Sequence, residues 1–194
     1  MNSTSLTDTQ MRIGNAAFLL FASSGYKATT TKQIAKSAGV NESTLFKSFK
    51  SKQDIFMVMK RLKMERIDDE CRVFFDGNFD STESFLQDAT LFIYKLFLDN
   101  TDLVMIMLKE LGHTELGIGE NSLFEMITKY LSIKLGTMIE SVSQSDSKYI
   151  SQSFMLVSSI VFLIVDQEHG NILTDEFENS ASLSDIAKLI CKMV

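Results

Sequence analysis

Five polar side chains within residues 41–48 carry the functional groups that recognise nucleic acid. Asn41, Glu42, Ser43, Thr44 and Lys47 supply an amide, a carboxylate, two hydroxyls and an ammonium group. Amides, hydroxyls and ammonium groups hydrogen-bond to base edges and to phosphates, and a carboxylate can accept a hydrogen bond from cytosine N4. If these residues lie on the outward face of one rigidly held helix, that helix can enter a major groove.

The small and apolar residues around this stretch have the spacing of a helix-turn-helix. Ala35 is small enough for the crossing of two helices, and four residues later Gly39 can take the left-handed conformation of the turn at no steric cost. Thr30 or Thr31 is expected to cap the first helix, and Asn41 the second. The apolar residues that should lock the second helix in place are Ile34, Leu45 and Phe49.

Charge is distributed very unevenly along the chain. Residues 1–63 contain ten Lys and Arg but three Asp and Glu, a net charge of +7, whereas residues 64–194 contain nine and twenty-two, a net charge of −13. The overall net charge of −6 therefore hides one segment that attracts phosphate and a larger one that repels it. This asymmetry favours double-stranded DNA as a partner of the N-terminal segment.

Residues 13–56 resemble the DNA-binding domain of the tetracycline-repressor (TetR) family. The resemblance implies a two-domain, all-helical homodimer whose third helix enters the major groove of a palindromic operator. It also implies a small, often hydrophobic effector that releases the DNA, and a dimer interface formed by the last two long helices. The matching residues are Ile13, Ala16-Ala17, Phe21, Gly25-Tyr26, Thr29-Thr30, Ile34-Ala35, Ala38-Gly39-Val40, Thr44-Leu45-Phe46, Phe49, Ser51-Lys52 and Ile55.

The motif and the resemblance together predict the residues that contact DNA. Thr44 and Lys47 should lie near base edges, and Lys52 should touch a phosphate. Phe46 stands where the family usually has a Tyr whose hydroxyl meets a phosphate, so Phe46 either faces the DNA without that bond or packs inward as core. Glu42 either accepts from cytosine N4 or, as we favour, stabilises its own helix through the helix dipole. The predicted DNA-binding residues are Thr30, Thr31, Lys32, Asn41, Glu42, Ser43, Thr44, Phe46, Lys47 and Lys52.

Helix signals recur along the whole chain, and no strand or hairpin signal stands out. Proline is absent, so long helices can run unbroken. We expect an all-α fold of about nine helices, with a DNA-binding domain at residues 1–50 and an effector-binding and dimerisation domain at 51–194. The expected helices cover 8–23, 31–38, 41–48, 51–76, 81–99, 101–112 (capped by Thr101), 122–141, 146–168 and a short segment from 182, with a loop at 112–120.

Phe and Met residues dominate the second domain. At helical spacing they indicate core first, and the resemblance adds a pocket for a largely apolar effector. The predicted pocket residues are Phe85, Phe92, Met105, Leu108, Phe124, Ile127 and Phe162. The apolar run Phe154–Val165 has twelve residues, fewer than the roughly 17–25 of a membrane span, so we interpret it as a buried helix that packs against a symmetry copy. The predicted dimer residues are Phe154, Val157, Val161, Leu183, Ile186 and Ile190.

The sequence offers no catalytic constellation. His113 and His169 lie in separate segments without Cys or His at zinc-ligand spacing, and no nucleophile elbow or phosphate loop is present. We therefore expect no enzyme activity, metal or cofactor. With no secretion signal and two reduced cysteines, Cys71 and Cys191, a cytoplasmic protein without a membrane partner is expected. The function predicted is an effector-responsive DNA-binding regulator, most simply a repressor. The alternative is a protein of the same fold that acts mainly through a protein partner.

Overall fold

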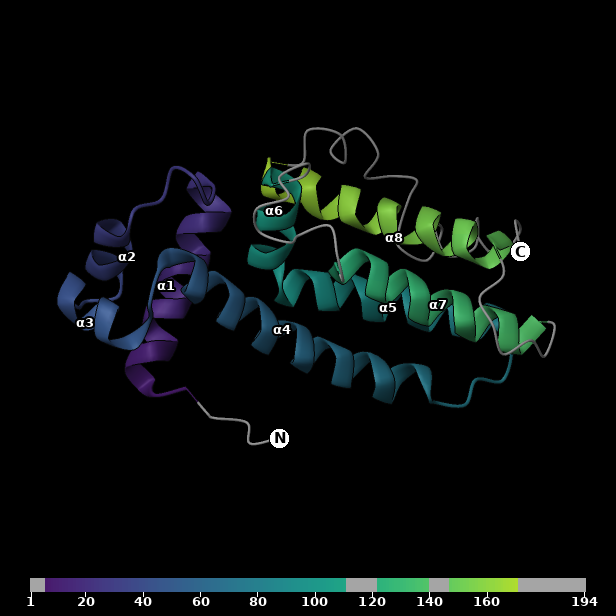
Figure 1. Ribbon diagram of the computed structural model, residues 1–194. Helices are drawn as coiled ribbons and strands as arrows, with labels where there is room; N and C mark the ends of the chain where they lie inside the picture. The colour runs from purple at the N-terminus through teal and green to yellow at the C-terminus, as the bar shows by residue number, and fades with distance from the viewer. Residues whose placement is uncertain (1–5, 111–121, 140–146, 171–194) are drawn as a thin grey trace. The chain divides into compact units, whose positions relative to one another are not determined.

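The computed structural model describes residues 6–110, 122–139 and 147–170, and this part of the chain is helical without a strand. The all-α prediction is therefore confirmed. Figure 1 labels the eight helices, which are α1 (Asp8–Ser24), α2 (Thr31–Ser37), α3 (Glu42–Ser48), α4 (Lys52–Phe75), α5 (Thr82–Asp99), α6 (Thr101–Lys109), α7 (Leu123–Ile139) and α8 (Ser147–Glu168). The ninth helix expected near residue 182 and the loop expected at 112–120 fall outside the described residues.

The described residues form two compact units. The first combines those of Met1–Arg66 with those of Asp102–Glu120, and the second combines those of Ile67–Thr101 with those of Asn121–Val194. Helix α4 is continuous through Arg66 and Ile67, so it belongs to both units. Helix α6 begins at Thr101, the end of the stretch Ile67–Thr101 of the second unit, and its other residues belong to the first unit. The first unit therefore contains α6 as well as the three N-terminal helices.

The helix starts of the first unit are fixed by polar side chains at the N-cap positions. Thr7 and Thr30 each form a capping box with the Gln three residues later, so two backbone N–H groups at each helix start gain a partner. Asn41 caps α3 by accepting from the Thr44 N–H at 2.8 Å. These observations confirm the predicted starts of α2 and α3.

Aromatic side chains from α1 and α4 fill the core of the first unit. Phe18 stacks on Phe56 with ring centroids 5.8 Å apart, and Phe21 lies 5.1 Å from the ring of Tyr26. Phe18, Phe21 and Phe56 are almost completely buried. Pairs of this kind stabilise beyond the area that they bury, so the packing holds α4 firmly against α1.

In the second unit α5, α7 and α8 pack on one another, and an aromatic cluster lies at the end of α4. Phe74 stacks on Phe92 at 4.2 Å, and Phe75 stacks on Tyr130 at 5.4 Å. Phe85 lies 6.1 Å from Phe75. The predicted pocket residues Phe85 and Phe92 are therefore neighbours of the same ring, Phe75.

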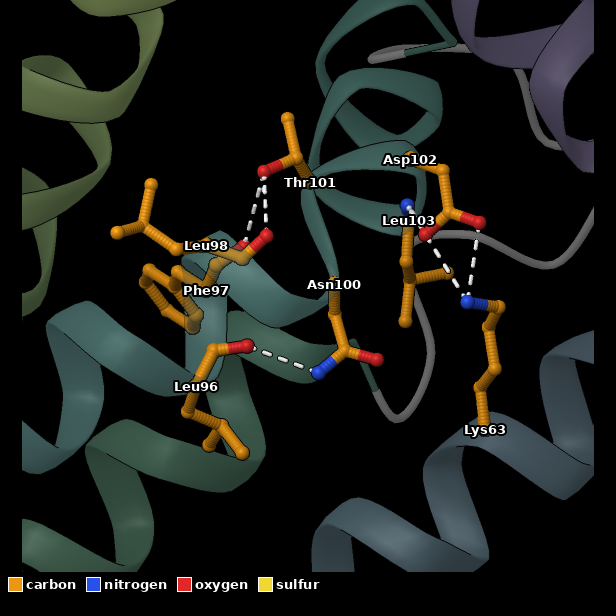
Figure 2. Close-up of polar contacts among 8 residues, drawn as sticks. All are labelled: Lys63, Leu96, Phe97, Leu98, Asn100, Thr101, Asp102 and Leu103. Atoms are coloured by element: carbon orange, nitrogen blue, oxygen red, sulfur yellow. Dashed lines mark hydrogen bonds and ion pairs between the residues drawn. The ribbon is translucent and has the colours of Figure 1, made fainter.

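The prediction for the start of α6 is wrong. Thr101 is the first helical residue rather than the cap, and its hydroxyl donates to the carbonyls of Phe97 and Leu98, as Figure 2 shows. Ser and Thr side chains make such bonds to preceding carbonyls, which competes with capping. The predicted end at Gly112 is also too late, because α6 ends at Lys109.

Helix α8 is only partly buried within the single chain, and its predicted packing against a symmetry copy stays a prediction. One face is fully buried through Tyr149, Leu156 and Ile160, but Phe154 and Phe162 are 53% and 54% exposed. By length and composition alone Lys148–Glu168 could cross a membrane, a test that the core helix of a soluble protein also passes. Nearly half of the stretch is buried inside the protein. One side of α8 therefore presents apolar side chains to solvent in the single chain.

Candidate DNA interface

The turn between α2 and α3 has the geometry that the sequence predicted. Gly39 has φ +66°, the left-handed region that favours glycine, and the Val40 N–H donates to the Ala35 carbonyl at 2.9 Å. Ala35 is 2% exposed, and Leu45 on α3 is completely buried. The small side chain and the tight turn therefore let α2 and α3 pack closely, which holds α3 in one orientation.

The outward side of α3 forms a polar surface, which we call the recognition face. Its members Asn41, Glu42, Ser43, Phe46 and Lys47 are exposed, and Thr44 is half-buried. Asn41 Oδ1 accepts from the Ser43 hydroxyl at 2.7 Å and from the Thr44 hydroxyl at 2.8 Å. Two hydroxyls of the recognition face are thus oriented before any DNA is bound.

Glu42 makes a contact that sequence reasoning did not foresee. Its carboxylate oxygen Oε1 accepts a hydrogen bond from the Thr31 hydroxyl at 3.0 Å, which connects the start of α3 to the start of α2. Thr30 and Lys32, on either side of Thr31, are exposed. The predicted contact residues of α2 therefore lie beside a carboxylate that already has one donor.

Phe46 faces solvent. Its side chain is 51% exposed, whereas Leu45 beside it is buried. The alternative in which Phe46 packs inward as core is therefore wrong. An exposed ring on a polar face is available to whatever α3 binds.

Lys52 is engaged with the protein itself. Its ammonium group donates to the carbonyls of Tyr26 and Thr29, at 2.7 Å each, and lies 4.2 Å from the centroid of the Tyr26 ring. Burial lowers the pKa of this ammonium group, and the nearby carboxylate of Glu110 acts in the opposite direction. Sequence reasoning missed this role, and the phosphate contact of Lys52 stays a prediction.

The predicted pocket residues are divided between the two units. Met105 and Leu108 lie on α6 in the first unit, whereas Phe85, Phe92 and Ile127 lie in the second, where Phe85 and Ile127 are completely buried. The ring centroid of Phe124 lies 5.1 Å from that of Phe154. Phe162 is on the exposed face of α8 rather than in the interior.

The predicted dimer residues also separate into two groups. Phe154 is exposed and Val161 is half-buried, both on the outer side of α8, whereas Val157 is completely buried within the chain and cannot face a partner. Residues 183, 186 and 190 fall outside the described residues. Three exposed apolar residues join Phe154 on that side at helical spacing: Ile150, Met155 and Phe162.

Within the described ranges no group of three or more His, Cys, Asp or Glu could hold a metal ion. His169 is exposed, with its Nδ1 2.7 Å from the Val165 carbonyl, and His113 falls outside those ranges.

Comparisons with known proteins agree with this geometry. Residues 13–59 match the family model of bacterial regulatory proteins, tetR family. The chain is 51% identical over 47 residues to the HTH-type transcriptional regulator YvkB of Bacillus subtilis (strain 168), a match that spans 24% of this chain and 25% of that protein. It is 25% identical over 164 residues to the fatty acid metabolism regulator protein of the same organism, covering 81% and 79% of the two chains.

The fold is similar to that of the transcriptional regulator FadR from Bacillus subtilis, whose structure was solved in complex with stearoyl-CoA. The TM-score is 0.66 at 19% identity, over 94% of this chain and 96% of that one. The helix-turn-helix and the all-α architecture therefore define a DNA-binding transcriptional regulator. Residues 13–59 match the tetR family model and form a DNA-binding domain of the type found in that family.

Proposed function

We propose that the chain is a repressor that binds a palindromic operator as a homodimer and is released from it by a small, largely apolar effector. The observation that carries the proposal is the recognition face, a polar surface held by the buried residues Ala35 and Leu45 in a segment of net charge +7. Within the proposal residues 1–50 bind DNA, and residues 51–194 bind the effector and dimerise. The protein acts in the cytoplasm and is not an enzyme.

The effector that we propose is a long-chain fatty acyl thioester of coenzyme A. Two relatives support this class: the fatty acid metabolism regulator that is 25% identical, and the FadR structure that contains stearoyl-CoA. The second unit offers a largely apolar interior, with Phe85 and Ile127 completely buried. The buried hydroxyls of Thr128 and Ser153 find no hydrogen-bond partner among the described residues, so a polar ligand atom or a water there would relieve a cost of about 1–3 kcal/mol each.

The dimer that we propose uses the exposed side of α8. Phe154, Met155 and Phe162 expose about half of their side chains each. Because a monomer gains nothing from leaving such an apolar face in water, pairing with a second copy across a two-fold axis supports the proposal. Light scattering at micromolar concentration should show twice the chain mass of 21.9 kDa.

DNA binding is tested by fluorescence anisotropy on a duplex that the protein itself selects from a random library. If the dimer neutralises about six to ten phosphates, the logarithm of the binding constant should fall against the logarithm of salt concentration with a slope of roughly −5 to −9. Stearoyl-CoA should weaken this binding, whereas free coenzyme A, the matched control without the acyl chain, should not. A binding constant independent of salt would refute DNA binding. Equal effects of stearoyl-CoA and coenzyme A would refute the proposed effector class alone.

A further inference from the structure

Two side chains at the end of α6 hold the turn that joins α1 to α2, although they lie more than eighty residues further along the chain. Glu110 accepts a hydrogen bond from the Tyr26 N–H on Oε1 at 3.0 Å. The ammonium group of Lys109 donates to the Ser23 carbonyl at 2.6 Å and also to the carbonyl of Ala22. All of these residues belong to the first compact unit. The end of α1 and the first residues of the turn are therefore fixed by α6.

The same turn is held from its carbonyl side by Lys52. The Tyr26 carbonyl accepts from the Lys52 ammonium group, while the Tyr26 N–H donates to the Glu110 carboxylate. The Thr29 carbonyl accepts from Lys52 as well, and the Thr29 hydroxyl donates to the Gly25 carbonyl at 2.8 Å. The Glu110 carboxylate thus binds the N–H of Tyr26, and the Lys52 ammonium group binds its carbonyl. Together these two hydrogen bonds fix the peptide planes of the turn.

The carboxylate of Glu110 lies in an unusual environment for a charged group, because the residue is only 5% exposed. Removing a carboxylate from water costs several kcal/mol unless donors and opposite charge surround it. Here the Tyr26 N–H supplies a donor, and the Lys52 ammonium group is close enough for Glu110 to influence its pKa. The burial of this charge is therefore compensated by contacts to the turn.

Helix α6 is fixed at its other end too. The Lys63 ammonium group of α4 lies 2.9 Å from Oδ2 of Asp102 and 3.0 Å from Oδ1, and the Leu103 N–H donates to the same carboxylate at 2.7 Å (Figure 2). Because the contacts of Asp102 and Glu110 hold both ends of α6, this helix is a fixed support for the turn between α1 and α2.

The turn determines where the recognition face is presented. Thr29 precedes Thr30, the N-cap of α2, and Thr31 at the start of α2 donates to Glu42 at the start of α3. A shift of the turn therefore displaces the start of α2 and, through that bond and the Ala35 packing, the start of α3.

We propose that Glu110 is a positioning residue for DNA binding, which fixes the Tyr26 amide and thereby the placement of α2 and α3. The inference rests on the DNA-binding function proposed above. Glu110 itself need not touch DNA.

The test compares the full-length protein with Glu110→Ala and Glu110→Gln, with Glu83→Ala in the first turn of α5 as the exposed control. Amide hydrogen exchange at Tyr26 is followed by NMR, and affinity for the selected duplex by anisotropy. Glu110→Ala should speed exchange at Tyr26 about tenfold and weaken DNA binding by about the same factor, as expected for the loss of a hydrogen bond to a charged acceptor. Glu110→Gln keeps an acceptor oxygen and should restore most of the protection, and Glu83→Ala should change neither quantity.

The outcomes separate this inference from the function on which it rests. Unchanged exchange at Tyr26 in Glu110→Ala, or unchanged affinity when exchange is faster, would overturn it. Equal acceleration at the core amides of α1, such as Ala17, would show general destabilisation and would also overturn it. Absence of DNA binding by the wild-type protein would instead overturn the proposed function.

Discussion

The Thr31 hydroxyl and the Glu42 carboxylate join the first residues of α2 and α3 through a hydrogen bond of 3.0 Å. The bond draws the carboxylate toward the neighbouring helix, while its position in the first turn of α3 also suits the helix dipole. Both effects favour a structural role for Glu42 over the acceptance of a hydrogen bond from cytosine.

This bond should be measurable as an energetic coupling. A double-mutant cycle is formed by Thr31→Val, Glu42→Ala and the double variant. The interaction of the two side chains is the part of the change in unfolding free energy that is not the sum of the two single changes. Because both side chains are near solvent, we expect a coupling of about 0.5 kcal/mol in the free energy of unfolding, at the low end for hydrogen bonds. Urea denaturation measures it, and strict additivity would contradict the contact. Glu42→Ala paired with Thr82→Val, far along the sequence in α5, is the control cycle and should be additive.

Thr44 and Lys47 should discriminate between DNA sequences. Replacing either by Ala should cost about 1–3 kcal/mol on the selected duplex and less on a scrambled one, because base contacts are lost only where the preferred bases are present. Anisotropy on both duplexes measures the difference. Lys95→Ala, an exposed lysine of α5, serves as the charge-matched control. Equal losses on both duplexes would mean that these residues grip the backbone only.

Phe46→Tyr should tighten DNA binding without changing preference. The ring is already 51% exposed, so the added hydroxyl meets no core contact and can reach a phosphate. We expect a gain of roughly 0.5–1.5 kcal/mol on both duplexes, the net value of one hydrogen bond. Phe46→Leu, which removes the ring, separates this gain from the contribution of the apolar surface. A neutral or weaker Tyr variant would contradict the proposed phosphate contact.

Cys71 should resist alkylation in the folded protein. Burial raises the pKa of its thiol to about 12, and the carboxylates of Asp68 and Glu70 act in the same direction. The reactive thiolate is therefore scarce at pH 8. Since the folded pKa lies above the unfolded value, the associated stability is present below the ordinary thiol pKa of about 8.5 and is lost as the pH rises toward 12. In a Cys191→Ser protein, iodoacetamide should label Cys71 at the rate of unfolding. Labelling as fast as in urea would contradict this.

Local sequence patterns predicted the helix starts well, since an N-cap residue acts on amides only two or three positions away. Asn41 caps α3 as expected, and Thr30, one of two candidates, caps α2. Ser81 caps α5, where a helix was expected to start near residue 81. Thr101 shows the limit of such patterns, because its hydroxyl can serve a preceding carbonyl instead of a following amide. The pattern alone cannot decide between the two.

The recognition face followed from the spacing of its small and apolar neighbours, but the contacts that position it did not. Glu110 meets Tyr26 across 84 residues, and nothing in the spacing of either residue indicates the other. The motif and the resemblance predict a phosphate contact for Lys52, but they do not indicate the hydrogen bonds of its ammonium group to the carbonyls of Tyr26 and Thr29. Contacts of high sequence separation arise from packing, which periodicity does not encode.

The composition of the first compact unit from two separate stretches of chain affects how DNA specificity can be exchanged between regulators. A recombination event or an engineered chimera that imported only residues 1–66 would set a foreign α1–α2 turn against the resident Lys109 and Glu110. A graft intended to keep the imported helix-turn-helix in its own geometry must therefore carry the segment from Asp102 to Glu110 as well. The two stretches are therefore expected to be inherited together, although more than thirty residues of the second unit separate them in the sequence.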